Sequence, residues 1–180
     1  MKPPILLTLD GSDKDERGLA VAAALAELGD ATLRLVRVFE TPIETLPSKA
    51  SGLAAVALRA DVVKSVRQTA ERAGATFRRE VAWDVIDGFD VADTLLNDLK
   101  AHDASLVVTA TRAAGAVGRA IQGSVADRLV RESPRPVVLV PPRAEYLGAK
   151  RIELRRVLVP LDGSLASLRV VPTLLSLSRA

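Results

Sequence analysis

The chain has 180 residues, enough for one well-packed domain and too few for two of ordinary size. Hydrophobic residues make up 48% and charged residues 26%, a composition typical of a soluble globular protein, and the absence of cysteine excludes disulfides and thiolate metal sites. A single histidine argues against a histidine-rich zinc site. Because no apolar stretch approaches the roughly 18 residues of a membrane span and no N-terminal signal is evident, we expect a cytoplasmic protein.

The formal net charge of +3 is unevenly distributed. Residues 1–111 carry 13 Lys or Arg against 17 Asp or Glu, whereas residues 112–156 carry 10 against 4. This basic region favours a phosphate-bearing ligand, although arginines on a solvated helix face explain Arg128 and Arg131 equally well. Aromatic residues are only 3%, and no stacking motif stands out, so nucleic-acid binding is not indicated.

Strand-like and helix-like segments alternate along the chain. Apolar runs predict strands at 5–9, 32–39, 75–86, 106–108 and 137–140, and helical periodicity predicts helices from residue 12 or 13 to about 27, at 50–73, at 91–101 and from Ser124 to before Pro134. Gly29 and Gly74 are expected to end the first two helices. Five strands alternating with four helices predict an α/β fold with a mainly parallel, doubly wound sheet and helices on both faces.

Two sets of polar residues invite a functional interpretation but have a structural one. His102 follows the predicted 91–101 helix, where a histidine is usually a cap or a partner of the helix dipole. Four aspartates, which would suggest a metal site, occupy a turn and a helix start, where aspartate is structurally common. They are Asp84, Asp87, Asp90 and Asp93.

A ligand site is predicted at the carboxyl ends of two strands. In doubly wound sheets, ligands bind where the strand order reverses. The loop from Thr109 to Ser124 follows the fourth strand and meets the start of a helix, where backbone N–H groups and the helix dipole favour an anion. Asp10 follows the first strand. We therefore expect Asp10 and this loop to form the walls of one crevice.

The C-terminal segment repeats the N-terminal one. Residues 157–180 resemble residues 5–28, with Leu-Asp-Gly-Ser at 9–12 and 161–164 and Arg169 in the place of Arg17. This predicts an α/β domain at 1–142, a charged linker at 143–156 and an incomplete second copy, a strand and a helix, at 157–180, as in a truncated tandem protein. Because a strand and a helix alone cannot bury their apolar surface, we expect this copy to dock on the first domain, pair with a partner chain or be poorly ordered.

Four sets of segments, taken together in their order along the chain, form a recognisable pattern. They are Leu6 to Ser12, Leu35 to Val38, Gly123 to Ala126 with Arg128 to Val130, and Pro136 to Val140. With these segments the chain resembles the universal stress protein family over residues 1 to about 142. The resemblance implies a Rossmann-like α/β fold of the adenine nucleotide alpha hydrolase type.

The resemblance also implies a nucleotide site with a degenerate glycine loop. Many family members bind ATP through Gly-x2-Gly-x9-Gly-Ser/Thr, and only the last of these glycines is kept here. Ala110 and Ala113 stand at the first two glycine positions, and Arg112 stands where the family often has histidine. The resemblance assigns Asp10 and Val38 to the adenosine end and Gly123, Ser124 and Val125 to the phosphates, with ATP and Mg²⁺ as the expected ligand. A turn, a core position and a helix cap explain Asp10, Val38 and Ser124 equally well.

The implied function is a stress-response protein that binds ATP or another adenine nucleotide as a regulatory ligand. Rapid hydrolysis is not expected, because no Gly-Lys-Ser/Thr element, acid–base pair or nucleophilic triad is evident. The alternative is a module of the same fold that binds no nucleotide and acts as a homodimer, through the last strand (Val137 to Val140) or the incomplete repeat. This strand is followed by Pro141 and Pro142, as an edge strand often is. An adenylate-forming enzyme on a related scaffold lacks its expected motif.

Overall fold

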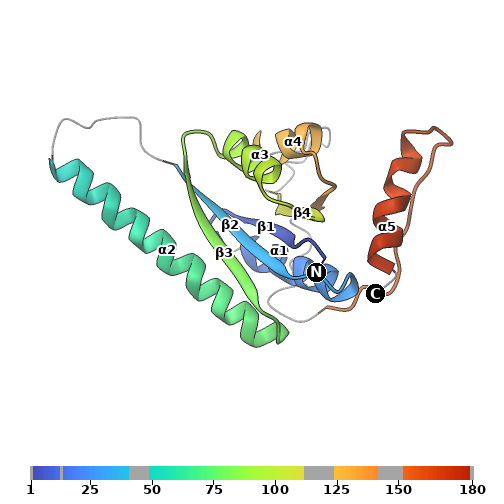
Figure 1. Ribbon diagram of the computed structural model, residues 1–180, viewed down its shortest axis with the longest axis horizontal. Coiled ribbons are helices and arrows are strands. Elements are labelled where there is room, and N and C mark those ends of the chain that lie inside the picture. The colour runs from blue at the N-terminus through green and yellow to red at the C-terminus, as the bar shows by residue number, and fades with distance from the viewer. Residues whose placement is uncertain (1, 13, 41–48, 112–123, 142–151, 179–180) are drawn as a thin grey trace.

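The computed structural model, shown in Figure 1, describes residues 2–12, 14–40, 49–111, 124–141 and 152–178. Strands and helices alternate in the first 140 residues, as the sequence predicts. In chain order the elements are β1 (Ile5–Leu9), α1 (Lys14–Leu28), β2 (Leu33–Glu40), α2 (Lys49–Phe77), β3 (Val81–Gly88), α3 (Val91–Ala101), β4 (Leu106–Ala110), α4 (Ser124–Glu132), β5 (Val137–Val140), the 3-10 helix η2 (Ser167–Arg169) and α5 (Val170–Ser178). None of the described helices is both long and apolar enough to span a membrane.

The five strands form one parallel sheet in the order β3-β2-β1-β4-β5. β1 lies at the centre, where Ile5 is in register with Leu33 of β2 on one side and with Leu106 of β4 on the other. The strand order reverses between β1 and β4, so their carboxyl ends lie next to each other. The predicted α/β fold with a doubly wound parallel sheet is confirmed, and the reversal marks the position at which such sheets bind ligands.

Helices cover both faces of the sheet, and each face has its own apolar core. α1 and α2 lie on one face, and α3 and α4 lie on the other (Figure 1). Because successive strand residues point to opposite faces, Leu7 of β1 joins Val66 of α2 in one core, and Leu6 joins Leu129 of α4 in the other. Leu6 and Leu7 are almost fully buried, as a continuous apolar run in a covered parallel strand predicts.

The second helix is longer than the sequence predicts. Gly74 does not end α2, which continues to Phe77, and the following strand begins only at Val81. A glycine inside a helix costs only about 1 kcal/mol, and the packing of Phe77 against the core favours the extra turn. Arg78, with a φ of 54°, takes the left-handed position that ends the helix. Gly74 instead allows the returning chain to approach, because a Cβ there would lie 3.2 Å from the backbone oxygen of Arg79.

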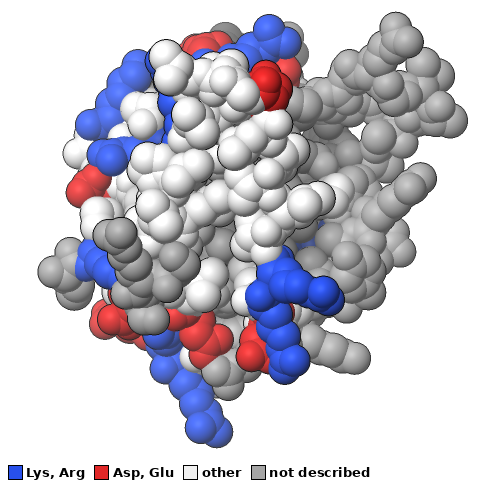
Figure 2. All heavy atoms as spheres, turned by 90° about the vertical axis from the view of Figure 1, so that its right-hand side faces the viewer, with Lys and Arg blue, Asp and Glu red and all other residues white. Residues whose placement is uncertain are grey.

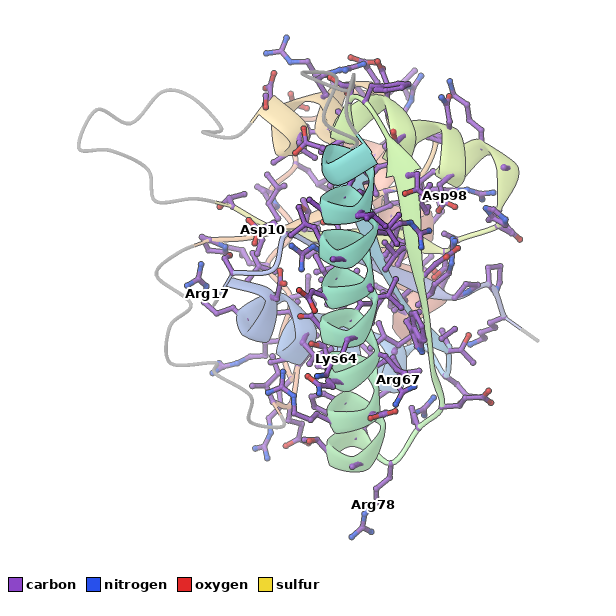
Figure 3. The ribbon with its side chains drawn as sticks, turned by 90° about the vertical axis from the view of Figure 1, so that its left-hand side faces the viewer. Asp10, Arg17, Lys64, Arg67, Arg78 and Asp98 are labelled. Atoms are coloured by element: carbon purple, nitrogen blue, oxygen red, sulfur yellow. The ribbon has the colours of Figure 1, made fainter. Side chains whose placement is uncertain are left out.

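His102 is the C-cap residue of α3, as predicted. Its backbone N–H donates to the Asp98 backbone oxygen, and its Nδ1 lies 2.8 Å from Asp98 Oδ1. The buried Asp98 carboxylate also accepts two hydrogen bonds from Arg34 of β2, at 2.7 and 3.0 Å. This network joins α3 to the sheet. In the view of Figure 3, Asp98 and Asp10 lie on opposite sides of α2.

The four aspartates of the turn and helix start have structural partners. The Asp90 carboxylate accepts the Asp93 backbone N–H at 2.7 Å and so caps α3. Within the part of the chain that the structure describes, no group of three or more acidic or histidine side chains is arranged to hold a metal ion. The ion pairs of these aspartates are Arg34 with Asp84, Arg59 with Asp87, and Arg128 with Asp90 and Asp93.

The prediction of a strand in the incomplete repeat is wrong. Residues 157–161 form no strand in the structure, and Val157 and Leu158 are 61% and 93% exposed. A strand is stable only beside a neighbouring strand, and none lies next to this segment in the described sheet. The following helix α5 does form, and Leu177 packs against the core on the α1 side. Figure 2 shows this end of the molecule, where uncharged side chains form a broad central area.

Candidate functional site

A cleft of about 530 Å³ opens at the carboxyl ends of β1 and β4. The strand reversal forms it, because the loops after two neighbouring parallel strands there lead to helices on opposite faces of the sheet. Residues from both halves of the fold therefore meet in one place. The lining residues are Thr8 to Ser12 and Asp15 from β1 and α1, Val38 and Glu40 from β2, Val91 and Leu95 from α3, Thr109 to Thr111 from β4 and beyond, and Ser124 to Ala126 from α4.

Five of the site residues that were predicted from the sequence are described in the structure, and they lie together. Asp10, Val38, Ala110, Ser124 and Val125 all line the cleft. Asp10 and the described ends of the predicted loop, Thr109 to Thr111 and Ser124, thus line one cleft, and the rest of that loop lies outside the described residues. The other predicted residues, Arg112, Ala113 and Gly123, lie outside the described residues.

The turn after β1 is held by its own side chains. Asp10 Oδ1 accepts the backbone N–H of Ser12 at 2.9 Å and the hydroxyl of Ser12. Gly11 has a φ of 81°, in the left-handed region that favours glycine, and a Cβ on Gly11 would lie 2.5 Å from Arg37 Nη1. Asp10 therefore orders the turn and faces the cleft at the same time, so its structural and ligand-binding interpretations are compatible.

Asp15 is a cleft residue that the sequence did not single out as part of the site. Its Oδ1 accepts the backbone N–H of Asp10 at 3.0 Å, and its Oδ2 accepts that of Gly11 at 2.8 Å. Burial raises the pKa of Asp15 to about 6, and the Asp10 carboxylate adds to the increase, whereas the two backbone N–H groups and the Arg37 guanidinium oppose it. In the sequence, Asp15 stands in the first turn of an expected helix, where an acidic residue suits the helix dipole, so nothing there marked it as a cleft residue.

The opposite wall of the cleft depends on the placement of α4. Arg128 donates to Asp90 at 3.1 Å and to Asp93, both at the start of α3, and to Glu132 on its own helix. The hydrogen bonds to Asp93 and Glu132 raise the pKa of Arg128 above its ordinary value. Arg128 thus joins α4 to α3 and helps to place Ser124, where backbone N–H groups at the helix start favour an anion.

Ala110 is accommodated by packing. Its side chain is partly buried against the core that β1 shares with α1. Gly18 of α1 faces it, because a Cβ on Gly18 would lie 3.8 Å from Ala110 Cβ and 2.9 Å from Leu7 Cδ1. The absence of a side chain at Gly18 leaves room on this face of the sheet for the Ala110 methyl group.

Comparisons with known proteins show which family the chain belongs to. The sequence matches the model of the Universal stress protein family over residues 1–141. The chain belongs to the universal stress protein family. A relative of this universal stress protein, "Universal stress protein in QAH/OAS sulfhydrylase 3'region" from Thermus aquaticus, is 33% identical over 136 residues, which are 76% of this chain and 96% of the relative.

Two solved structures of universal stress proteins are similar in fold. One is a universal stress protein in complex with cAMP, 20% identical, with a TM-score of 0.58 over 78% of this chain and 98% of that chain. The other is the universal stress protein from Archaeoglobus fulgidus in complex with dAMP, also 20% identical, with a TM-score of 0.54 over 77% and 97% of the two chains. At 20% identity, the likeness to these two structures shows that this universal stress protein has the same fold.

The two ends of the cleft in this universal stress protein differ in chemistry. Among the described lining residues, the charged side chains are Asp10, Asp15 and Glu40, all at the end near β1 and β2. Carboxylates there can accept hydrogen bonds from hydroxyl and amino groups. The start of α4 instead offers a hydroxyl and backbone N–H groups to an anion. The cleft therefore suits a ligand with a neutral, donor-rich end and a phosphate end.

Proposed function

We propose that this protein binds an adenine nucleotide as a regulatory ligand in a stress response. The observation that carries the proposal is the placement of Asp10 and Ser124 in one cleft of about 530 Å³, a volume within the usual range of small-molecule sites. Asp10 and Val38 would contact the adenosine, and Ser124 and Val125 the phosphates. Two proteins of the same fold, solved with cAMP and dAMP, support this ligand class.

ATP with Mg²⁺ is the form that we expect to bind, without rapid hydrolysis. Mg²⁺ usually binds through phosphate oxygens and water together with one or two carboxylates, so it needs no dedicated protein cage. The Asp10 carboxylate accepts two hydrogen bonds from Ser12 and so orders the turn after β1. Because this carboxylate has a structural task, we expect the bound nucleotide to remain intact and to act as a regulatory ligand.

Calorimetric titration of the full chain with ATP and Mg²⁺ tests the proposal. We expect a Kd below about 100 µM, lost in the double variant Asp10→Ala/Ser124→Ala. Asp61→Ala/Ser65→Ala is the matched control, because both residues are exposed on α2 and do not line the cleft. ATP hydrolysis is followed in the same samples. Binding that survives in the Asp10→Ala/Ser124→Ala variant contradicts the proposed site, and fast turnover contradicts the regulatory role.

A second candidate function is a protein-interaction module that acts as a homodimer. The exposed apolar side chains of the C-terminal repeat favour it, since Leu158 and Leu165 are 93% and 85% exposed. β5 is the last strand of the described sheet and offers another pairing edge. Sedimentation of the full chain, with Leu158→Asp and Leu139→Asp as separate variants, tells which segment dimerises; Leu139 is the β5 residue chosen because it belongs to neither core cluster. A stable dimer with no heat of ATP binding favours this second function, and a monomer contradicts it.

A further inference from the structure

The turn that follows β1 occurs twice in the molecule. Gly11 and Gly163 have φ values of 81° and 82°. In the first copy Asp10 Oδ1 accepts the backbone N–H of Ser12 at 2.9 Å, and in the second Asp162 Oδ1 accepts that of Ser164 at the same distance. The second copy forms this turn with Ser167 in the place of Asp15. The turn itself therefore does not need a carboxylate at that position.

Asp15 nevertheless places its carboxylate in the cleft wall. Both carboxylate oxygens accept backbone N–H groups of the turn, from Asp10 and Gly11. When Asp15 is ionised, these two N–H groups are occupied and cannot bind a ligand. When one oxygen takes a proton, it becomes a weaker acceptor, and the N–H group that it held becomes available.

The other charges around Asp15 come from two elements. Asp10, in the turn that precedes α1, and Glu40, at the end of β2, line the cleft with it. The Arg37 guanidinium of β2 lies close to Gly11, and its positive charge favours the ionised form of Asp15. Arg17 of α1 is not part of the described cleft lining, and the segments that α3, β4 and α4 contribute to that lining are uncharged. An anionic nucleotide therefore shares the cleft with three carboxylates, which lie at the β1 and β2 end.

We propose that Asp15 is a positioning residue that couples nucleotide binding to proton uptake. The anionic nucleotide binds preferentially to the form in which the Asp15 carboxylate has taken a proton from solvent and released one backbone N–H of the turn. This inference rests on the proposed function. The ordinary pKa of an aspartate would leave almost no protonated form near neutral pH, but burial raises the pKa of Asp15 to about 6. The nucleotide phosphate raises it further, so bound and free protein differ in protonation above about pH 6.

The test uses cAMP, because its phosphodiester does not titrate near neutral pH, whereas a phosphate monoester has a pKa near 6. We expect the affinity of the full chain for cAMP to fall between about pH 6 and about pH 8, by up to tenfold per unit. Titration in two buffers with different ionisation enthalpies should show uptake of up to one proton. Proton release, or a Kd that does not change with pH, overturns the inference.

Two variants separate proton coupling from a purely structural role. The first is Asp15→Asn, and the second is Asp15→Ser, which introduces the residue found at the same position of the repeat. Each variant should bind cAMP with the same affinity at about pH 6 and about pH 8. Asp61→Asn on α2 is the control and should keep the wild-type pH dependence. An undiminished pH dependence in Asp15→Asn contradicts the inference. Should that variant fail to fold by circular dichroism, the proton count of the wild-type protein decides.

The proposed function and this inference fail in different ways. If neither ATP nor cAMP binds at any pH, both are wrong. If a nucleotide binds, and binding is lost in Asp10→Ala/Ser124→Ala but is independent of pH, the proposed function stands and Asp15 has no part in it.

The titration of Asp15 can be followed without ligand, from the NMR resonance of its carboxyl carbon. A pKa near 4 in the free protein also contradicts the inference, because too little protonated form would be present.

Discussion

The hydroxyl of Thr8 on β1 donates a hydrogen bond to the hydroxyl of Thr109 on β4, with 2.8 Å between the two oxygens. The two residues are in register in the parallel strand pair, and both line the cleft. The bond therefore joins the two central strands at the place where the strand order reverses. It is a polar contact between β1 and β4 beneath the proposed ligand.

The effects of removing the two hydroxyl groups on the free energy of unfolding should be coupled. Thr109→Val leaves the hydroxyl of Thr8 without this partner in a partly buried position, and we expect it to lower the free energy of unfolding by about 1–3 kcal/mol. Thr8→Val should act similarly. The double variant should lose less than the sum of the two, since it leaves neither hydroxyl unpaired. Urea unfolding of all four proteins measures the coupling, and additive losses would contradict it.

Gly11 and Gly163 allow a matched comparison of backbone strain and side-chain contact. Both have φ near 80°, so alanine at either position is strained by about 1 kcal/mol or more. A Cβ at Gly11 would also meet the Arg37 guanidinium at 2.5 Å, whereas a Cβ at Gly163 would meet nothing within 4 Å. We expect Gly11→Ala to lower the melting temperature more than Gly163→Ala. Addition of Arg37→Ala should recover part of that difference, and equal effects of the two alanines would show that Arg37 moves aside freely.

Asp15 should make the fold less stable as the pH rises from about 4 to about 6. The folded protein holds a proton on Asp15 up to about pH 6, whereas the ordinary aspartate value of 3.8 applies when the chain is unfolded. Between these values the folded state binds more protons, so its stability decreases with increasing pH and then stays constant. Asp15→Asn should remove this decrease and raise the free energy of unfolding at pH 7 by up to about 3 kcal/mol.

Urea unfolding of wild type and Asp15→Asn across this pH range measures the effect. Asp61→Asn is the control for the loss of one negative charge and should behave as wild type, because Asp61 is exposed on α2. A variant that is less stable than wild type at pH 7 would show that the two backbone hydrogen bonds of Asp15 outweigh the effect of its burial.

Arg128 should hold α4 in place. Arg128→Gln removes the ion pairs with Asp90 and Asp93 of α3 and leaves α4 attached mainly through Leu129 and its neighbours. We expect faster amide hydrogen exchange in α4 and weaker nucleotide binding, with exchange in β1 and β2 unchanged. Arg131→Gln is the matched control, since Arg131 pairs only within its own helix in the described contacts, with Asp127. Equal exchange in the two variants would argue against a role for the α3 contacts.

The local features of the fold follow from residues close together in the sequence. Apolar runs predicted the strands, because a parallel strand that is covered on both faces excludes polar residues. Asp90 and His102 were placed correctly at the two ends of α3, because a cap depends on the backbone a few residues away. Gly74 misled the prediction, since the cost of one helical glycine is smaller than the gain from packing Phe77.

By itself, the sequence determined the family, the alternation of strands and helices, and the expectation that Asp10 and the loop from Thr109 to Ser124 form one crevice. Only the tertiary structure decided that Asp15 belongs to that cleft, that Arg128 joins α4 to α3, and that residues 157–161 form no strand. The physical reason is the same in all three cases. Burial, the approach of distant charges and the presence of a neighbouring strand depend on residues far apart in the chain, and no local pattern encodes them.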